Sequence, residues 1–225
     1  MALKALIFDL DGTVIQSHNI LYMALQDYFT PEQCERVMHE YAILKGLNEK
    51  QAVPRIRELL EISHISVDQL RHDLVALCNA YKKKIGMSFV QGFENFHASY
   101  AATPLAYCIA TNGMGASLAT TMGLINIKHY FGERIYTPEH VDGKTKPDPA
   151  LFLYALGQLG CSPEEAIIFE DSHIGVAAAH AAGVACIGIN TAGNLDFDRD
   201  NLLLCVDDYS TLTVELIHKK FSERE

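Results

Sequence analysis

The 225-residue sequence lacks the features that would assign it to a membrane or to secretion. None of its apolar runs approaches the roughly 18 residues that suggest a membrane-spanning helix. The opening segment reaches the charged Asp9 too early to serve as the apolar region of a signal peptide, and there is no Asn-x-Ser/Thr glycosylation site. We therefore expect a cytoplasmic protein with no membrane partner.

Positive charge and paired cysteines are also scarce. Lys and Arg number 18 against 28 Asp and Glu, which gives a net charge of -10. Such a chain repels phosphate backbones and anionic lipid surfaces, so binding to nucleic acid through bulk charge is disfavoured. The six cysteines form no Cys-x-x-Cys pair, and most have apolar neighbours, which indicates free thiols in a reducing compartment.

Strand and helix patterns alternate along most of the chain. Apolar runs predict strands at residues 3–10, 105–110, 166–169, 184–189 and 202–206, and helical patterns lie near residues 116–123, 149–159 and 174–182. Because strands that alternate with helices form parallel sheets, we expect an α/β fold, a three-layer Rossmann-like core around a parallel sheet. A further helix start is predicted at Ser162-Pro163.

Residues 16–86 differ from the rest, because their apolar residues recur at helical spacing only. Helix starts are indicated at Thr30-Pro31 and Ser66, Pro54 is expected to interrupt or start a helix, and the lysines at 82–84 are interpreted as a solvated helix end. The predicted organisation is a discontinuous α/β core, residues 1–15 and 87–225, with an all-helical insert at residues 16–86.

Polar residues gather where the predicted strands end. They are Asp9 and Asp11, then Thr111, Asn112 and Gly113, then Glu170 and Asp171, with Lys146 between the last two groups. Ligand sites in open α/β sheets lie beyond the carboxyl ends of the strands, so these groups are expected to meet. Asp9 and Asp11 are two positions apart and leave an extended chain on the same side, so both can address one reacting atom.

The charges of these groups indicate a metal ion. Asp9, Glu170 and Asp171 would place three negative charges against the single positive charge of Lys146. Two like charges 4 Å apart repel by about 1 kcal/mol in water and about 4 kcal/mol at an effective dielectric constant near 20. A hard divalent cation with oxygen ligands relieves this repulsion, and carboxylates without His or Cys suit Mg²⁺.

The sequence resembles the haloacid dehalogenase (HAD) superfamily. Asp9-Leu-Asp-Gly-Thr13, Thr111, Lys146 and Glu170-Asp171 match its four motifs in order, and the helical insert resembles its α-helical (C1) cap. The segments around Thr111, Lys146 and Glu170 are similar to those of bacterial sugar-phosphate phosphatases of this group, such as 6-phosphogluconate phosphatase. The resemblance implies a Mg²⁺-dependent phosphatase that acts on a small phosphorylated metabolite.

The resemblance also implies roles for the motif residues. Asp9 would attack phosphorus to form an aspartyl-phosphate, and Asp11 would protonate the leaving oxygen and then activate water. Mg²⁺ would be held by Asp9, Asp171 and the main-chain carbonyl of Asp11, with Glu170 behind them. The phosphoryl oxygens would be stabilised by Thr111, the backbone of Asn112 and Gly113, and Lys146.

Related activities on the same fold are less compatible with the sequence. A β-phosphoglucomutase-like phosphotransferase would need a hinge His where this chain has Leu21, and a phosphate-binding Arg where it has Glu49. A dehalogenase would need neither Asp11 nor the acidic pair 170–171, and a phosphonatase would need a Schiff-base Lys in the cap, for which Lys45 or Lys50 is conceivable. A nucleotidase, a phospho-acceptor signalling domain and a silent binding module are further alternatives.

Selection of the substrate is expected in the cap, because the core motifs contact only the phosphoryl group. Lys45 and Asn48 lie in a segment that resembles the family's substrate-facing turn, so they are candidate contacts to the leaving group. An ordinary helix end with Gly46 as its stop is the alternative interpretation. The substrate itself and the oligomeric state are left open, although a monomer is plausible.

Overall fold

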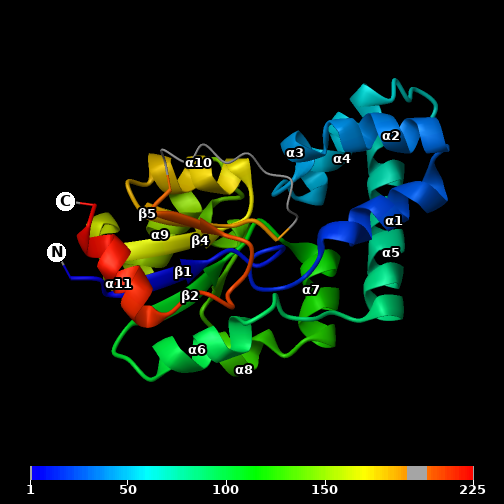
Figure 1. Ribbon diagram of the computed structural model, residues 1–225. Coiled ribbons are helices and arrows are strands. Elements are labelled where there is room, and N and C mark those ends of the chain that lie inside the picture. The colour runs from blue at the N-terminus through cyan, green and yellow to red at the C-terminus, as the bar shows by residue number, and fades with distance from the viewer. Residues whose placement is uncertain (1, 192–201, 225) are drawn as a thin grey trace.

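The computed structural model describes residues 2–191 and 202–224, so the stretch 192–201 of the expected core lies outside the described residues. A parallel sheet forms the centre of the described part (Figure 1). Its strands are β1 (Ala5–Phe8), β2 (Ala106–Ala110), β3 (Ile135–Tyr136), β4 (Ala166–Glu170), β5 (Ala185–Ile189) and β6 (Leu204–Val206), in the order β3-β2-β1-β4-β5-β6. The predicted α/β fold is confirmed, and β3, which has only two residues, is an addition to it.

Helices cover both faces of the sheet and make three layers. On one face lie α6 (Phe93–Ala101), α8 (Ile127–Phe131) and α11 (Val214–Ser222), and on the other lie α9 (Ala150–Leu159) and α10 (His173–Ala181). Alternation along β1 explains the two layers, because Leu6 and Phe8 join one hydrophobic cluster and Ala5 and Ile7 join the other. None of the helices in the described part of the chain has the length and apolar character required to cross a bilayer.

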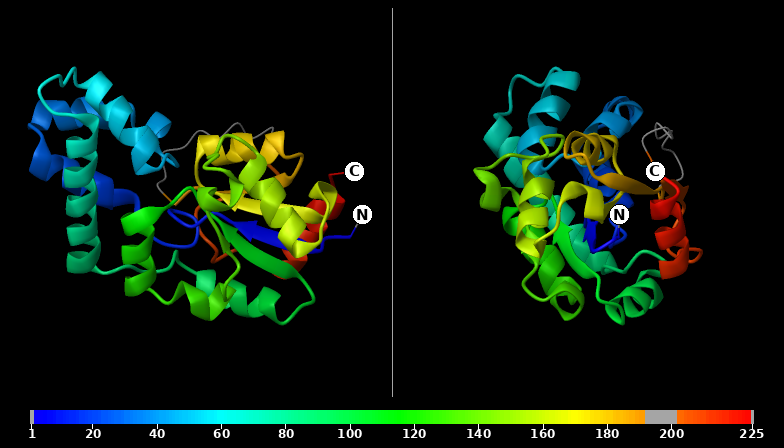
Figure 2. Two further views of the ribbon diagram at one scale, coloured as in Figure 1. Left: turned by 180° about the vertical axis from the view of Figure 1, so that it is seen from behind. Right: turned by 90° about the vertical axis from the view of Figure 1, so that its left-hand side faces the viewer.

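The segment between β1 and α6 forms a group of helices, which we call the helical insert. It contains α1 (His18–Tyr28), α2 (Pro31–His39), α3 (Tyr41–Leu44), α4 (Glu49–Leu59) and α5 (Val67–Ile85). These helices share a hydrophobic cluster of their own and stand to one side of the sheet, beyond the carboxyl ends of its strands (Figures 1 and 2). The division of the chain into two domains at residues 16 and 86 stays a prediction.

The predicted helix starts have mixed outcomes. Thr30 and Ser66 cap α2 and α5 through their side-chain oxygens, as expected. Ser162-Pro163 starts only a single 3₁₀ turn, Pro163–Glu165, because β4 begins at the next residue. The expectation for Pro54 was wrong, since this residue lies inside α4 without ending it.

The last turn of α5 agrees in part with the interpretation as a solvated end, because Lys83 and Lys84 are exposed but Lys82 is not. Lys82 is buried, and its ammonium donates to the carbonyl oxygen of Ser117 at 3.1 Å, to the Ser117 hydroxyl at 2.8 Å and to the Thr121 hydroxyl at 3.0 Å. These acceptors belong to α7 (Gly115–Leu124), which follows β2 and packs against α5. Lys82 is therefore a contact between the helical insert and the sheet-bearing part of the chain.

Candidate active site

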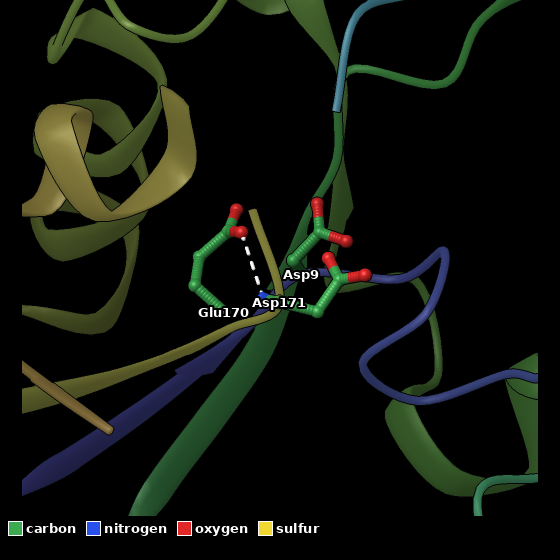
Figure 3. A group of neighbouring side chains, drawn as sticks. All are labelled: Asp9, Glu170 and Asp171. Carbon is green, nitrogen blue, oxygen red and sulfur yellow. Dashed lines mark hydrogen bonds between the residues drawn. The ribbon is translucent and has the colours of Figure 1, made fainter. Parts of the chain in front are cut away.

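Three carboxylates from two neighbouring strands meet at the carboxyl edge of the sheet. Asp9 follows β1, Glu170 ends β4 and Asp171 comes next (Figure 3). One oxygen of each carboxylate lies within 4.8 Å of the others, and all three residues are buried. The strands bring them together because β1 and β4 pair in parallel, with Phe8 opposite Phe169.

Lys146 is the cation at the centre of this group. Its ammonium lies 2.6 Å from Asp9 Oδ1 and 2.6 Å from Glu170 Oε1, and only 1% of the residue is exposed. Burial opposes its charge, but the two carboxylates prevail and raise the pKa of Lys146, so the ammonium form is the stable one. For Asp9, burial dominates over the attraction of Lys146 and holds the pKa well above its usual range.

Both oxygens of the Glu170 carboxylate accept hydrogen bonds from the protein. While Oε1 accepts from Lys146, Oε2 accepts from the backbone N–H of Asp171 at 3.0 Å, the N–H of Ser172 at 3.1 Å and the Ser172 hydroxyl at 2.9 Å. Figure 3 shows the first of these bonds as a dashed line. Gly175 makes room for the carboxyl group, because a Cβ at that position would lie 1.9 Å from the Glu170 carboxyl carbon.

Asp171 contacts a residue of the helical insert. Its Oδ2 forms an ion pair at 2.8 Å with the ammonium of Lys45, and both side chains are at most 5% exposed. Burial is the main reason that the pKa of Asp171 rises to about 7, with Lys45 opposing the rise and Glu170 adding to it.

Asp11 and the segment 111–113 line the same cavity. Gly12 takes a left-handed conformation (φ 82°), which turns the chain directly after Asp11. The N–H of Gly113 donates to the Thr111 hydroxyl at 2.9 Å, and a Cβ at Gly113 would lie 3.6 Å from Asp11 Oδ2. The Asp11 carboxylate and the Thr111 hydroxyl therefore face one small region above the strand ends.

A cavity of about 210 Å³ lies between the strand ends and the helical insert. Asp9, Asp11, Thr111 and Asp171 line it from the sheet. From the insert it is lined largely by aliphatic side chains, which include Ile20, Leu21, Leu44, Leu47, Val53 and Leu74. The cavity thus has an acidic end beside Lys146 and an apolar end in the insert.

The remaining predicted residues also line this cavity, but protein partners occupy their side chains. Asn48 caps α4, with its Oδ1 accepting from the N–H of Lys50 and of Gln51. Asn112 Oδ1 accepts from the N–H of Lys146 at 2.9 Å. The ammonium of Lys45 forms the ion pair with Asp171 that is described above. Most of the predicted site residues therefore line one cavity, and the two that do not, Lys146 and Glu170, lie behind Asp9 and are linked to it through the Lys146 ammonium.

Several residues that contribute to the site were not predicted from the sequence. Ser172 binds Glu170 through both its N–H and its hydroxyl, and Gly175 gives the carboxylate its space. Gln51 Nε2 donates to the Thr145 hydroxyl at 2.7 Å, next to Lys146 in the chain. Ser172 is adjacent to the acidic pair and could have been suspected, whereas the partner of Gln51 is 94 positions away.

Comparisons with known proteins agree on one family. A family model described as haloacid dehalogenase-like hydrolase matches residues 6–189. The 6-phosphogluconate phosphatase of Escherichia coli is 24% identical over 189 residues, which cover 81% of this chain and 80% of that protein. The phosphorylated carbohydrates phosphatase of Thermotoga maritima is 24% identical over 192 residues, 81% of this chain and 82% of its own length. A HAD family hydrolase from Deinococcus radiodurans, crystallised with bound phosphate and sodium, shares the fold with a TM-score of 0.73, at 22% identity and 97% coverage of each chain.

Proposed function

The chain belongs to the haloacid dehalogenase-like hydrolase family, and we propose that it is a cytoplasmic phosphatase that hydrolyses a small phosphomonoester, a sugar or sugar-acid phosphate. The observation that carries the proposal is the position of Asp9, whose carboxylate bonds the buried Lys146 at the floor of a cavity also lined by Asp11 and Thr111. Two relatives with matching length, which are named as phosphatases of phosphorylated carbohydrates, support the substrate class.

In this proposal Asp9 is the nucleophile. Lys146 holds Oδ1 at 2.6 Å and so orients the carboxylate, while Oδ2 attacks phosphorus and forms an aspartyl-phosphate. The bond from phosphorus to the substrate oxygen breaks, and the oxygen leaves as an alcohol once it receives a proton. Water then attacks the aspartyl-phosphate, which releases inorganic phosphate and restores Asp9.

Asp11 is the acid and base of the two steps. Its carboxylate faces the region above Thr111 and Gly113, where the leaving oxygen of a phosphate on Asp9 would lie. In the first step the protonated Asp11 carboxyl group donates its proton to that oxygen, and in the second step the resulting carboxylate accepts a proton from the attacking water. The Thr111 hydroxyl, the backbone of Gly113 and the Lys146 ammonium hold the phosphoryl oxygens and stabilise their charge.

The acidic cluster fits a hard divalent cation, for which we propose Mg²⁺. The candidate ligands are all oxygens, and one oxygen of each of the three buried carboxylates lies within 4.8 Å of the others. Asp9, Asp171 and the carbonyl of Asp11 would hold the ion. Glu170 would support them from behind, since both of its oxygens already have protein donors. When bound, the ion would neutralise the carboxylates and help to hold the phosphate.

Binding of Mg²⁺ is expected to stabilise the protein in a pH-dependent way. Without metal, the raised pKa of Asp171 stabilises the folded state below the usual pKa of Asp, and this contribution is lost as the pH rises through about 7. Because the ligands bind metal when deprotonated, Mg²⁺ should stabilise more at about pH 8 than at about pH 5. At about 100 times Kd the gain is about 2.7 kcal/mol, or roughly 5–10 °C in Tm.

Thermal melts of the wild type and of Asp171→Asn, with and without Mg²⁺, measure this effect. The variant is expected to lose most of the Mg²⁺-dependent shift, because it lacks one of the buried carboxylates. An equal shift in both proteins would place the metal elsewhere.

The helical insert is proposed to act as a cap that selects the leaving group. It supplies the apolar end of the cavity together with Lys45, Asn48 and Glu49. Leu21 and Glu49 both line the cavity, so neither the histidine nor the arginine of a mutase is present there. A second phosphate would approach the carboxylate of Glu49, and phosphotransfer between sugar positions is therefore not favoured.

A panel of phosphorylated metabolites, assayed for phosphate release with Mg²⁺, tests the function. We expect hydrolysis of p-nitrophenyl phosphate and of at least one sugar phosphate, and loss of both when EDTA is added. Lys45→Ala should change the ratio of kcat/KM between substrates by roughly tenfold or more, since Lys45 lines the cavity from the insert. Lys50→Ala, at an exposed position of α4, is the matched control.

Two results would contradict these expectations separately. A wild type that releases no phosphate from any substrate would overturn the phosphatase proposal. A Lys45→Ala variant with unchanged selectivity would remove Lys45 from the substrate contacts while leaving the activity itself in place.

A further inference from the structure

The helical insert touches the core at two points beside Lys146. The carbonyl oxygen of Gly46 accepts a hydrogen bond from Asn112 Nδ2 at 2.9 Å, and Gln51 Nε2 donates to the Thr145 hydroxyl at 2.7 Å. Gln51 is itself fixed, because its Oε1 accepts from the N–H of Asn48 at the start of α4. The first contact therefore starts from the loop between α3 and α4 and ends at Asn112, which bonds the backbone of Lys146. The second starts from the first turn of α4 and ends at Thr145, the neighbour of Lys146 in the chain.

Asn112 joins these parts through a single amide. Its Oδ1 accepts from the N–H of Lys146 at 2.9 Å, and Nδ2, besides bonding Gly46, lies 3.4 Å from the carbonyl oxygen of Lys146. The residue is only 4% exposed. The amide oxygen thus bonds a backbone group of the core, and the amide nitrogen bonds a backbone group of the insert. With both atoms bonded to protein, the Asn112 side chain is not available to bind a substrate.

The loop that carries Gly46, residues 45–48, is tightly seated on the core. Gly46 has φ +83°, and a Cβ there would lie 2.5 Å from the Ser172 hydroxyl and 2.8 Å from a side-chain carbon of Ile174. Only glycine permits this approach without displacing its neighbours. The neighbouring Lys45 reaches Asp171 from the same loop. The loop position is consequently defined by direct contact with the residues that hold Glu170 and Asp171.

We propose that Asn112 is a positioning residue that ties the loop 45–48 to the backbone of Lys146. The Lys146 side chain is long, yet its ammonium must reach Asp9 and Glu170 at 2.6 Å each. A fixed backbone limits the ways in which it can do so. Docking of the loop therefore helps to place the Lys146 ammonium next to Asp9. The hydrogen bond between Gln51 and Thr145 is a second tie between the insert and the segment that carries Lys146. The kinetic consequence rests on the proposed phosphatase function.

The substitution Asn112→Asp separates the two halves of this amide. A carboxylate at this position still accepts from the N–H of Lys146, but it cannot donate to Gly46 and it faces that carbonyl with a negative charge. Asn126→Asp is the matched control, because Asn126 also accepts from a backbone N–H, that of His129, and lies at the start of α8 outside the cavity. Thr145→Val removes only the second tie.

Two measurements test the proposal. With p-nitrophenyl phosphate and Mg²⁺, Asn112→Asp should lower kcat by about 10- to 100-fold and change KM by less than about threefold, since the ammonium is misplaced and not removed. Hydrogen exchange should become roughly 2- to 10-fold faster at residues 41–48, as expected for one lost hydrogen bond. Thr145→Val should give smaller changes of both kinds, and Asn126→Asp none.

The contrary outcomes are distinct. A higher KM with unchanged kcat would make Asn112 a substrate contact, and unchanged exchange at residues 41–48 would remove the tie to the loop; either result overturns the proposal. If Asn112→Asp fails to fold, the test falls to Thr145→Val. Wild-type values of kcat and of hydrogen exchange at residues 41–48 in that variant would also overturn the proposal. Hydrogen exchange can be measured without any catalytic turnover. A wild type without phosphatase activity would therefore overturn the proposed function, but the exchange measurement would still test the tie between Asn112 and the loop.

Discussion

Replacing Asp9 by asparagine is expected to lower phosphate release by more than about 10³-fold and to leave the protein folded. The amide has the shape of the carboxylate but is not nucleophilic, so the covalent intermediate cannot form. Its oxygen can still accept from Lys146, which also keeps its bond to Glu170. Since burial holds the pKa of Asp9 above its usual range, loss of this charge is expected to leave Tm unchanged or higher.

Asp142→Asn is a suitable control for this experiment. Asp142 is exposed and has φ 53°, a conformation that asparagine tolerates well, so the same chemical change should leave the rate at the wild-type level. The decisive measurement is single-turnover phosphate release with Mg²⁺, alongside a thermal melt of each protein. An Asp9→Asn variant that kept a tenth of the rate would show that Asp9 is not the nucleophile.

Gly175→Ala is expected to destabilise the protein by about 3 kcal/mol or more, because the new methyl group would occupy the place of a buried carboxyl group. The added Cβ would lie 1.9–2.1 Å from the carboxyl atoms of Glu170. Glu170 would have to move, which would break its bonds to Ser172 and leave Lys146 with one partner. Activity is expected to fall together with stability.

The same substitution at Gly157 provides the comparison. Gly157 lies inside α9, and a Cβ there would meet nothing within 4 Å. Gly157→Ala should therefore stabilise the protein by about 0.4–1 kcal/mol, through helix propensity and a less flexible unfolded chain. Urea unfolding of both variants measures the difference. If Gly175→Ala cost less than about 1 kcal/mol, Glu170 would have room to shift, and its close packing would not matter for stability.

The central features of this fold could be predicted from the sequence because they depend on local patterns. Buried parallel strands appear as continuous apolar runs, and the polar residues that follow them must share one edge of the sheet. On this basis Asp9, Glu170 and Asp171 were expected to meet, and their oxygens lie within 4.8 Å of one another. β3 could not be predicted in the same way, since two residues carry no periodicity.

Contacts between distant segments lay beyond such reasoning. The lysines at 82–84 look like a solvated helix end, and only the packing of α5 against α7 buries Lys82. In the same way, the sequence predicted a role for the backbone of Asn112 at the phosphoryl group, but it gave no indication that the side-chain amide bonds Gly46 and Lys146. Local sequence predicts which side chains lie at the carboxyl edge of the sheet, but it does not predict which residues they bond there.

The position of β1 in the sheet bears on how the chain reaches its folded state. This strand carries Asp9, yet its two neighbours in the sheet come much later, with Ala5 paired to Ala106 on one side and to Ala166 on the other. During synthesis the nucleophile strand gains its first partner only when β2 has left the ribosome and its second only when β4 has, whereas the helical insert precedes both and contains a hydrophobic cluster of its own. Nascent chains halted before residue 166 can therefore hold a structured insert, but not an assembled site.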